Sequence, residues 1–406
     1  MNPDCDDAPR RALVLGAGAA YGAFQIGALR HIIGRKKTCF SVMTGASVGA
    51  VNAAVLAQAE SPDEVASRYL NTLEDIWQSI DGSGQIMGRP WARKLSPIVG
   101  LLCQGPCNLD PLRDLLEEHV CPHKLKDSPI ELAIEVACLD TGRIAVVEPE
   151  DPHFLEFLIA SCSMPMYFAP VTIEGYMIPS AYCEELGLSP AARADIAGLP
   201  FPSLDSLRRR LRNRGVYGKC SERKVDRLAA LLWTKAERRS DLHWCDAYIR
   251  RILPLTPALK KKPDEVTVIH ALPTCMQSGD LGDDTDRLES FQPRVEQAMK
   301  ILCHEIQRTN SATAHVLNEL LRCWRALDQA VPDSHRFRNT EAWQDMEDYL
   351  GRYHLVSEIT EISPHPEYID GHPLDFTPEL ITELIEHGEE CAEEAMPAEE
   401  PVLTMP

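Results

Sequence analysis

The fold is decided by residues 44–50, which read Thr44-Gly45-Ala46-Ser47-Val48-Gly49-Ala50. This is a G-x-S-x-G pattern. The short apolar run 40–43 before it is typical of a buried strand, and the small residues 50–56 after it continue as a helix. A sharp strand-to-helix turn pushes a serine hydroxyl out of the sheet edge, and the flanking glycines let the backbone turn without a Cβ clash. Ser47 is therefore predicted to be a nucleophile; an ordinary turn without chemistry is the alternative.

A second glycine-rich turn lies upstream, after the apolar strand 12–15. It reads Gly16-Ala17-Gly18-Ala19 and opens a helix. Backbone amides at such a turn can hold a phosphate or the oxyanion of an acyl-transfer intermediate. A dinucleotide fingerprint is the rival interpretation, but the spacing is G-x-G-x-x-x-G and the strand 39–44 ends without an acidic residue for a ribose. A nicotinamide cofactor is therefore not expected.

Together, the two turns resemble the arrangement in the patatin-like phospholipase family. Other stretches carry the same resemblance: 129–143, in which Cys138 replaces the family's first aspartate, the segment 160–170, the late strand 264–269 and the closing helix 376–388. The resemblance covers residues 10–390 apart from one insertion. It implies a three-layer α/β fold with a central, mostly parallel sheet and helices on both faces.

What this resemblance implies for activity is a serine acyl hydrolase that acts on lipid esters with a Ser-Asp dyad. Ser47 lies at the position of the family's nucleophile, and Ala17, Gly18 and Ala19 lie at its three oxyanion-loop glycines. Two of these glycines are alanine here. Because alanine resists positive φ, the loop is expected to be mis-aimed, and a lost oxyanion donor costs on the order of 10²–10³ in turnover.

The family's catalytic aspartate is harder to place. The resemblance aligns its turn with residues 173–186, where Pro179 occupies the aspartate's position. Proline accepts no proton, so the dyad is not expected to form there. Glu174, Glu184 and Glu185 are neighbouring substitutes, with Glu184 as the candidate base. Two functions stay open: a weak or altered lipid acyl hydrolase, or a catalytically inactive descendant that binds lipid or a partner.

A different enzyme class would use a histidine triad of the α/β-hydrolase type. His270 and His365 are late enough in the chain to serve. Thirteen histidines in 406 residues make such a coincidence easy, however. A zinc site is also disfavoured, because its best candidates have unusual ligand spacing, and no metal is expected; the candidates are Cys103, Cys107, Cys121 and His123.

Composition indicates where the protein works. Hydrophobic residues make up 44% of the chain, and no apolar run reaches the length of about 18 residues that a membrane span needs. The first ten residues are too polar for a signal peptide. Fourteen cysteines without paired spacing are expected to stay reduced. The sequence therefore predicts a cytoplasmic protein.

Charge is unevenly distributed along the chain. The total is −20, yet residues 207–262 hold 17 of the 41 Lys and Arg against five acids, a local +12 that leaves −32 for the remainder. The five acids are Glu222, Asp226, Glu237, Asp241 and Asp246. Because this stretch departs from the family, we expect a patatin-like domain over 10–200 and 262–390, a basic helical insertion over 201–261, and an acidic disordered tail over 391–406.

The insertion is predicted to form amphipathic helices over 225–232 and 242–252, flanked by Trp233, Trp244 and Tyr248. Basic helices with such aromatics suit an anionic bilayer surface, which would make this a peripheral membrane protein. A cap docked on the acidic core is the alternative. Nucleic acid is not expected, because no binding motif accompanies the charge, and nothing indicates an oligomeric state. The arginines expected at the membrane are Arg208, Arg209, Arg210, Arg212 and Arg214.

Overall fold

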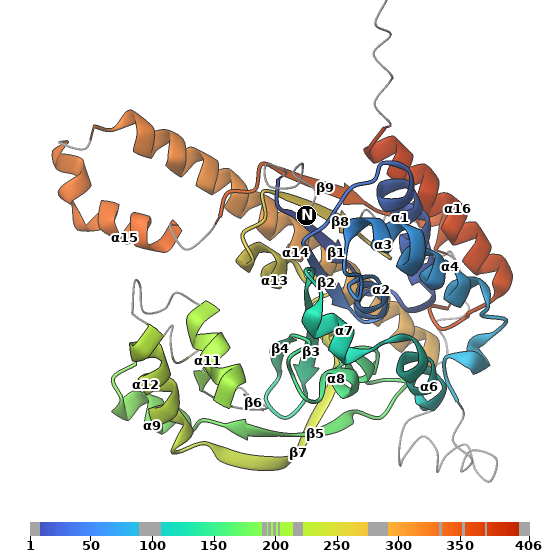
Figure 1. Ribbon diagram of the computed structural model, residues 1–406, viewed down its shortest axis with the longest axis horizontal. Helices are drawn as coiled ribbons and strands as arrows, with labels where there is room; N and C mark the ends of the chain where they lie inside the picture. The colour runs from blue at the N-terminus through green and yellow to red at the C-terminus, as the bar shows by residue number, and fades with distance from the viewer. Residues whose placement is uncertain are drawn as a thin grey trace, which may run out of the picture.

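A mixed α/β architecture is observed in the computed structural model (Figure 1). The described residues are 9–88, 107–188, 193, 196–197, 200–201, 204–213, 222–274, 291–332, 335–350, 354–369 and 372–397. Within them a single nine-stranded sheet forms the centre. Its strands are β1 Arg11–Leu15, β2 Val42–Ala46, β3 Glu131–Cys138, β4 Arg143–Val147, β5 Val171–Met177, β6 Pro200–Phe201, β7 Glu237–Asp246, β8 Glu265–Ile269 and β9 Glu358–Ile362.

The strand order is β6-β5-β7-β3-β2-β1-β8-β9, with β4 paired to β3. Five adjacent strands, β3, β2, β1, β8 and β9, run parallel, whereas β4, β5, β6 and β7 form antiparallel pairs. The register of β1 on β2 pairs Leu15 with Gly45, so both glycine-rich turns leave the same edge of the sheet. Ligand sites of open α/β sheets form at this carboxyl edge.

Helices cover both faces of the sheet. Their bounds are α1 Ala23–Leu29, α2 Val48–Leu56, α3 Pro62–Glu64, α4 Leu70–Gln78, α6 Asp110–His119, α7 Pro122–Asp127, α8 Phe154–Ser161, α9 Ser180–Glu185, α11 Leu204–Asn213, α12 Glu222–Trp233, α13 Leu255–Lys260, α14 Phe291–Ala330, α15 Glu341–Leu350 and α16 Pro378–Ala395. Shorter 3₁₀ or π turns are η2 Ala19–Gly22, η3 Arg30–Arg35, η4 Val65–Tyr69, η5 Ser83–Gln85, η7 Ala247–Ile249, η9 Arg336–Asn339 and η10 Pro366–Tyr368.

Alternation along β1 divides the core between the two faces. Leu13 and Leu15 belong to the large cluster beneath α1, α2 and α16, while Ala12 and Val14 belong to a second cluster on the side of α13 and α14. Because successive side chains of a strand point to opposite faces, this alternation produces the three layers. The predicted fold class, a mostly parallel central sheet between helical layers, is confirmed.

The predicted helix over 242–252 is wrong. Residues up to Asp246 belong to strand β7, which pairs with both β3 and β5. Trp244 is buried against Phe157, with the ring centroids 4.9 Å apart, and Tyr248 is buried too. The apolar spacing that suggests a helix arises because the end of β7 is buried on both faces. Helices α11 and α12 do form, and they pack on each other around their own small core, which includes Leu207 and Leu232.

The C-terminal region also differs from the expectation. Helix α16 continues through Ala395, and Cys391 and Ala392 are buried in the core, so the disordered tail does not begin at residue 391. Residues 398–406 lie outside the described residues. The late strand and closing helix are confirmed as β8 and α16. Among the described helices, none has the length and apolar content that a membrane crossing requires.

Candidate active site

Ser47 stands at the turn from β2 into α2 with φ 54° and ψ −130°. A non-glycine residue in this conformation costs on the order of 1–3 kcal/mol and persists only where the surroundings impose it. Here the close approach of α2 does so: a Cβ on Gly45 would lie 2.4 Å from the Ala50 Cα, and one on Gly49 would lie 2.4 Å from the Leu15 carbonyl oxygen. The two glycines of the pattern are therefore required by packing, and the predicted sharp turn from strand to helix is present.

The neighbouring loop presents two backbone N–H groups without a partner among the described residues, those of Gly18 and Ala19. The flanking amides are occupied, because Ala17 N–H donates to the Ile252 carbonyl at 3.0 Å and Ala20 N–H to the Pro373 carbonyl at 2.9 Å. Ala19 adopts φ 50°, so its methyl group does not prevent the left-handed conformation. The alanine at 19 thus accommodates positive φ, whereas the alanine at 17 uses its amide in the bond to Ile252.

The carboxyl group of Asp246, a residue of the expected insertion over 201–261, lies beside Ser47. Asp246 ends β7 and is 1% exposed. The sheet register brings the two residues together across β3, since Ala46 pairs with Glu135 and Asp246 pairs with Val136. The backbone N–H of Tyr248 donates to Asp246 Oδ1 at 2.9 Å.

Burial raises the pKa of Asp246 to about 7, and donation from the Ser47 hydroxyl and the Tyr248 amide only partly opposes that rise. Asp246 Oδ2 is buried and has no partner of normal hydrogen-bond geometry in the described part of the chain. The contact with Ser47 is therefore looser than a standard hydrogen bond. Catalytic pairs in ligand-free enzymes often show such geometry and tighten only around substrate.

The last residue of α8 and the turn that follows it hold Ser47 and Asp246 in place. The Ser161 hydroxyl accepts the backbone N–H of Ser47 at 2.9 Å and donates to the Glu135 carbonyl at 3.0 Å. Two residues later, the Ser163 carbonyl accepts the backbone N–H of Asp246 at 2.9 Å. The segment 160–165 thus joins the elbow to the acid. Cys162 lies between these serines, and burial raises the pKa of its thiol well above the ordinary value, so it stays protonated.

An apolar cavity opens onto Ser47. Its walls come mainly from α2, α4 and α6 and from the turns that face them. The lining includes Ala19, Val48, Val51, Val55, Leu73, Ile76, Trp77, Met87, Leu112, Leu115, Met164, Phe168 and Phe376. Such a lining suits a hydrocarbon chain and offers few partners to a polar substrate.

The match to known proteins agrees with this arrangement. Residues 13–184 match the model of the patatin-like phospholipase family. This part of the chain is similar to the patatin-like phospholipases. The cGAMP-activated phospholipase of Escherichia coli (strain TW11681) is 27% identical over 186 residues, which cover 40% of this chain and 49% of that protein. The chain therefore matches about half the length of this curated relative. The crystal structure of VipD from Legionella pneumophila aligns with 95% of this chain and 66% of its own at 10% identity and a TM-score of 0.35, too weak a likeness to bear on function.

The substitute bases predicted from the sequence lie elsewhere. Pro179 precedes the first turn of α9, and Glu184 on that helix is exposed and pairs with Arg193. Glu174 pairs with Arg238, also at the surface. The interpretation of Glu184 as the base is therefore wrong, because the carboxyl beside Ser47 is that of Asp246. An aspartate followed by a small residue at the end of a strand, Cys245-Asp246-Ala247, is the sequence signal that could have found it.

In the described part of the chain, neither His270 nor His365 has a hydrogen bond to Ser47. His270 is fully buried, with Nε2 2.8 Å from Glu361 Oε2 and Nδ1 2.9 Å from Gln307 Nε2, so both ring nitrogens have other partners. The backbone N–H of His365 donates to His387. The hydrogen bonds of both histidines therefore join parts of the fold and do not include Ser47.

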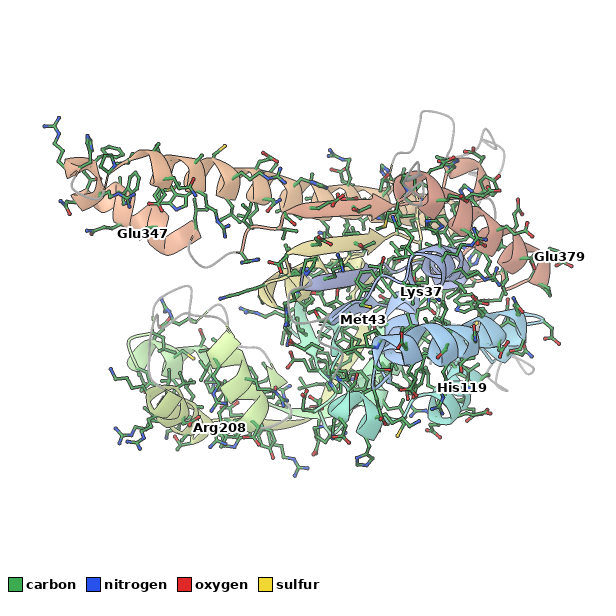
Figure 2. All side chains as sticks on the ribbon, turned by 45° about the horizontal axis from the view of Figure 1, so that its top comes forward. Lys37, Met43, His119, Arg208, Glu347 and Glu379 are labelled. Atoms are coloured by element: carbon green, nitrogen blue, oxygen red, sulfur yellow. The ribbon has the colours of Figure 1, made fainter. Side chains whose placement is uncertain are left out.

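The predicted membrane-facing arginines lie partly in ion pairs. Arg208 contacts Asp205 at 2.6 Å and Arg212 contacts Asp226 at 3.0 Å, both on the α11–α12 hairpin. Arg209 lies 3.9 Å from Glu148 of the main body. Figure 2 shows Arg208 on this hairpin, which the long strands β5 and β7 carry away from the centre of the sheet. Arg214 and the side chain of Arg210 lie outside the described residues.

Proposed function

We propose that this protein is a serine acyl hydrolase that cleaves lipid acyl esters with Ser47 as nucleophile and Asp246 as base. The observation that carries the proposal is the buried Asp246 carboxyl beside a serine held at positive φ. A general base works best when its pKa lies near the operating pH, and burial brings the pKa of Asp246 to about 7. An unassisted serine hydroxyl is a poor nucleophile, so this carboxylate supplies what the elbow lacks.

The reaction follows from the placement of these groups. The Asp246 carboxylate accepts the Ser47 proton as the serine oxygen attacks the ester carbonyl. The negative charge on the carbonyl oxygen is met by the amides of Gly18 and Ala19 and by the first amides of α2, which have no intrahelical acceptor. Collapse releases the alcohol, which takes the proton from Asp246. Water then hydrolyses the acyl-enzyme with Asp246 again accepting and returning a proton.

The cavity supports a lipid substrate. An acyl chain bonded to the Ser47 oxygen lies directly beside this apolar cavity, whose lining includes Val48 and Trp77. Each buried methylene contributes about 0.8 kcal/mol, so this wall favours a chain of several carbons over acetyl. The family match to phospholipases agrees with this substrate class.

An inactive lipid- or partner-binding descendant is the alternative that the sequence leaves open. Its main support is the missing acid at Pro179. Asp246 removes that support, so the hydrolase is the better proposal.

Peripheral contact with an anionic membrane is a separate part of the proposal. It rests on the basic α11–α12 hairpin, which projects on a ribbon of β5 and β7 (Figure 1). Arg238 and Arg239 on β7 are exposed as well, but Glu174 and Asp241 pair with them. The pairs with Asp205 and Asp226 likewise neutralise part of the charge of the hairpin.

The proposal is tested by labelling Ser47 with a fluorophosphonate and by assaying p-nitrophenyl esters of increasing chain length. We expect covalent labelling that Ser47→Ala abolishes, and faster hydrolysis of medium-chain esters than of acetate. Folded wild-type protein that takes up no probe and cleaves no ester would support the inactive alternative instead.

A further inference from the structure

Three buried polar side chains form a continuous chain of hydrogen bonds through the apolar core. The indole Nε1 of Trp77 donates to Asn52 Oδ1 at 3.0 Å, and Asn52 Nδ2 donates to Gln25 Oε1 at 2.9 Å. Gln25 Nε2 then donates to the carbonyl oxygen of Gly16 at 2.8 Å. Gln25 and Asn52 are fully buried and Trp77 is 4% exposed.

Every polar side-chain atom of this three-residue hydrogen-bond network has a partner. The second amide hydrogen of Gln25 faces the Ile269 carbonyl at 3.4 Å, and that of Asn52 faces the Gly22 carbonyl at 3.4 Å. Fully satisfied buried networks hold their members in one arrangement, whereas a group left unpaired costs about 1–3 kcal/mol. Apolar residues of similar shape would fill the same space without that risk, so the network calls for a role beyond packing.

The two ends of the network lie at the two parts of the candidate active site. Gly16 lies two residues before Gly18 and three before Ala19, whose amides have no partner in the described part of the chain. Trp77, at the other end, forms part of the wall of the cavity that opens onto Ser47. The hydrogen bonds therefore connect the wall for the acyl chain to the amides for the oxyanion.

We propose that Gln25, Asn52 and Trp77 act as positioning residues that hold the oxyanion loop in register and tie that register to the occupied cavity. The claim rests on the proposed hydrolase function. Gln25 fixes the Gly16 carbonyl, and with it the direction of the Gly18 and Ala19 amides. An acyl chain of the substrate that packs against Trp77 stabilises the position of the indole. Through the hydrogen bonds, the indole in turn stabilises the positions of Asn52 and Gln25. Turnover therefore rises when the substrate chain is long enough to reach Trp77.

Gln25→Met tests this directly, because methionine keeps the length of the side chain and removes both donors. Gln58→Met is the matched control: Gln58 is equally buried and bonds the His119 carbonyl at 2.9 Å and the Cys121 amide at 2.7 Å, outside the network. Both variants are compared for kcat and KM on p-nitrophenyl acetate and octanoate, and for inhibition by an octyl trifluoromethyl ketone, whose Ser47 adduct needs the oxyanion amides.

We expect Gln25→Met to lower kcat at least about tenfold with KM nearly unchanged, a part of the 10²–10³ that a whole oxyanion donor is worth. The loss should be larger for octanoate than for acetate, and the ketone should bind correspondingly more weakly. Gln58→Met should change none of these values. Equal effects of the two variants, or a loss confined to KM, would overturn the proposal.

Backbone hydrogen exchange separates this claim from the proposed function. In Gln25→Met, and in Trp77→Phe, which removes only the indole donor and part of the ring, the peptide over residues 16–22 should exchange faster than in wild type and in Gln58→Met. This readout needs no activity. If the wild type neither hydrolyses esters nor takes up a fluorophosphonate, the function fails, while exchange still decides the positioning: unchanged exchange in both network variants would refute it.

Discussion

Asp246 lies beside Ser47 because strand β3 stands between the strands that carry them. The β3 register sets Ala46 opposite Glu135 and Asp246 opposite Val136, so the ends of β2 and β7 meet although the two strands run in opposite directions. The turn at Ser161 and Ser163 then binds the backbone of both residues. The pair is thus positioned by the sheet and by a turn far from either residue in the sequence.

The first prediction concerns the pH dependence of hydrolysis. Because the pKa of Asp246 is raised to about 7, the carboxylate that accepts the serine proton is lost as the pH falls below that value. We expect kcat/KM to fall tenfold per pH unit below about pH 7 and to level off above it. The measurement is a pH profile with an uncharged ester. A profile that stays flat down to pH 5 would mean that another group is the base.

The second prediction concerns stability: the free energy of unfolding should fall as the pH rises, whereas hydrolysis should increase. A folded pKa raised from 3.8 to about 7 means that the ionised Asp246 destabilises the fold, so the penalty for its charge is absent at low pH, where it is protonated, and is largest above pH 7. At about 1.4 kcal/mol per pKa unit, the cost reaches a few kcal/mol. Asp246→Asn should therefore resist urea better than wild type at pH 8, and this advantage should shrink at pH 5. An advantage of equal size at both pH values would contradict the assignment.

Much of this site was predictable because it is local in the sequence. The strand, the turn at Ser47 and the loop at 16–19 each follow from short patterns of apolar residues and glycines. Asp246 was not predictable in the same way. Its strand ends buried on both faces, which mimics helical spacing, and the surrounding arginines suggest a separate basic insertion. The pairing of β7 with β3, a contact between distant segments, is what places the aspartate, and the local signal Cys245-Asp246-Ala247 does not by itself predict that contact.

A third prediction concerns Pro179. If the acid were missing, Pro179→Asp combined with Ser180→Gly would restore the dyad and raise ester hydrolysis. Because Asp246 already lies beside Ser47 and Pro179 is the N-cap of α9, we expect no gain in kcat/KM from the double variant. A gain in correctly folded protein would show that the productive acid belongs near residue 179.

The fourth prediction concerns the basic hairpin. Each basic residue near an anionic surface contributes about 1 kcal/mol, so a variant with glutamine at Arg208, Arg209 and Arg212 should bind anionic vesicles at least tenfold more weakly at low salt. Binding of wild type should also weaken as salt rises. Co-sedimentation with phosphatidylserine vesicles measures both effects, and neutral phosphatidylcholine vesicles are the control. Wild-type protein that ignores the anionic vesicles would identify the hairpin as a cap, in line with the approach of Arg209 to Glu148.

The most direct test of the Ser47–Asp246 pair is the kcat/KM for p-nitrophenyl octanoate in Asp246→Asn. Asp151→Asn is the matched control, because Asp151 is also a buried aspartate whose pKa is raised by burial, and its Oδ1 likewise accepts a backbone N–H, that of His153 at 2.9 Å. Loss of the acid from a serine triad costs roughly 3 × 10⁴ in turnover, and we expect a loss of this order in Asp246→Asn with little change in Asp151→Asn. Hydrolysis by Asp246→Asn at the wild-type rate would contradict the account.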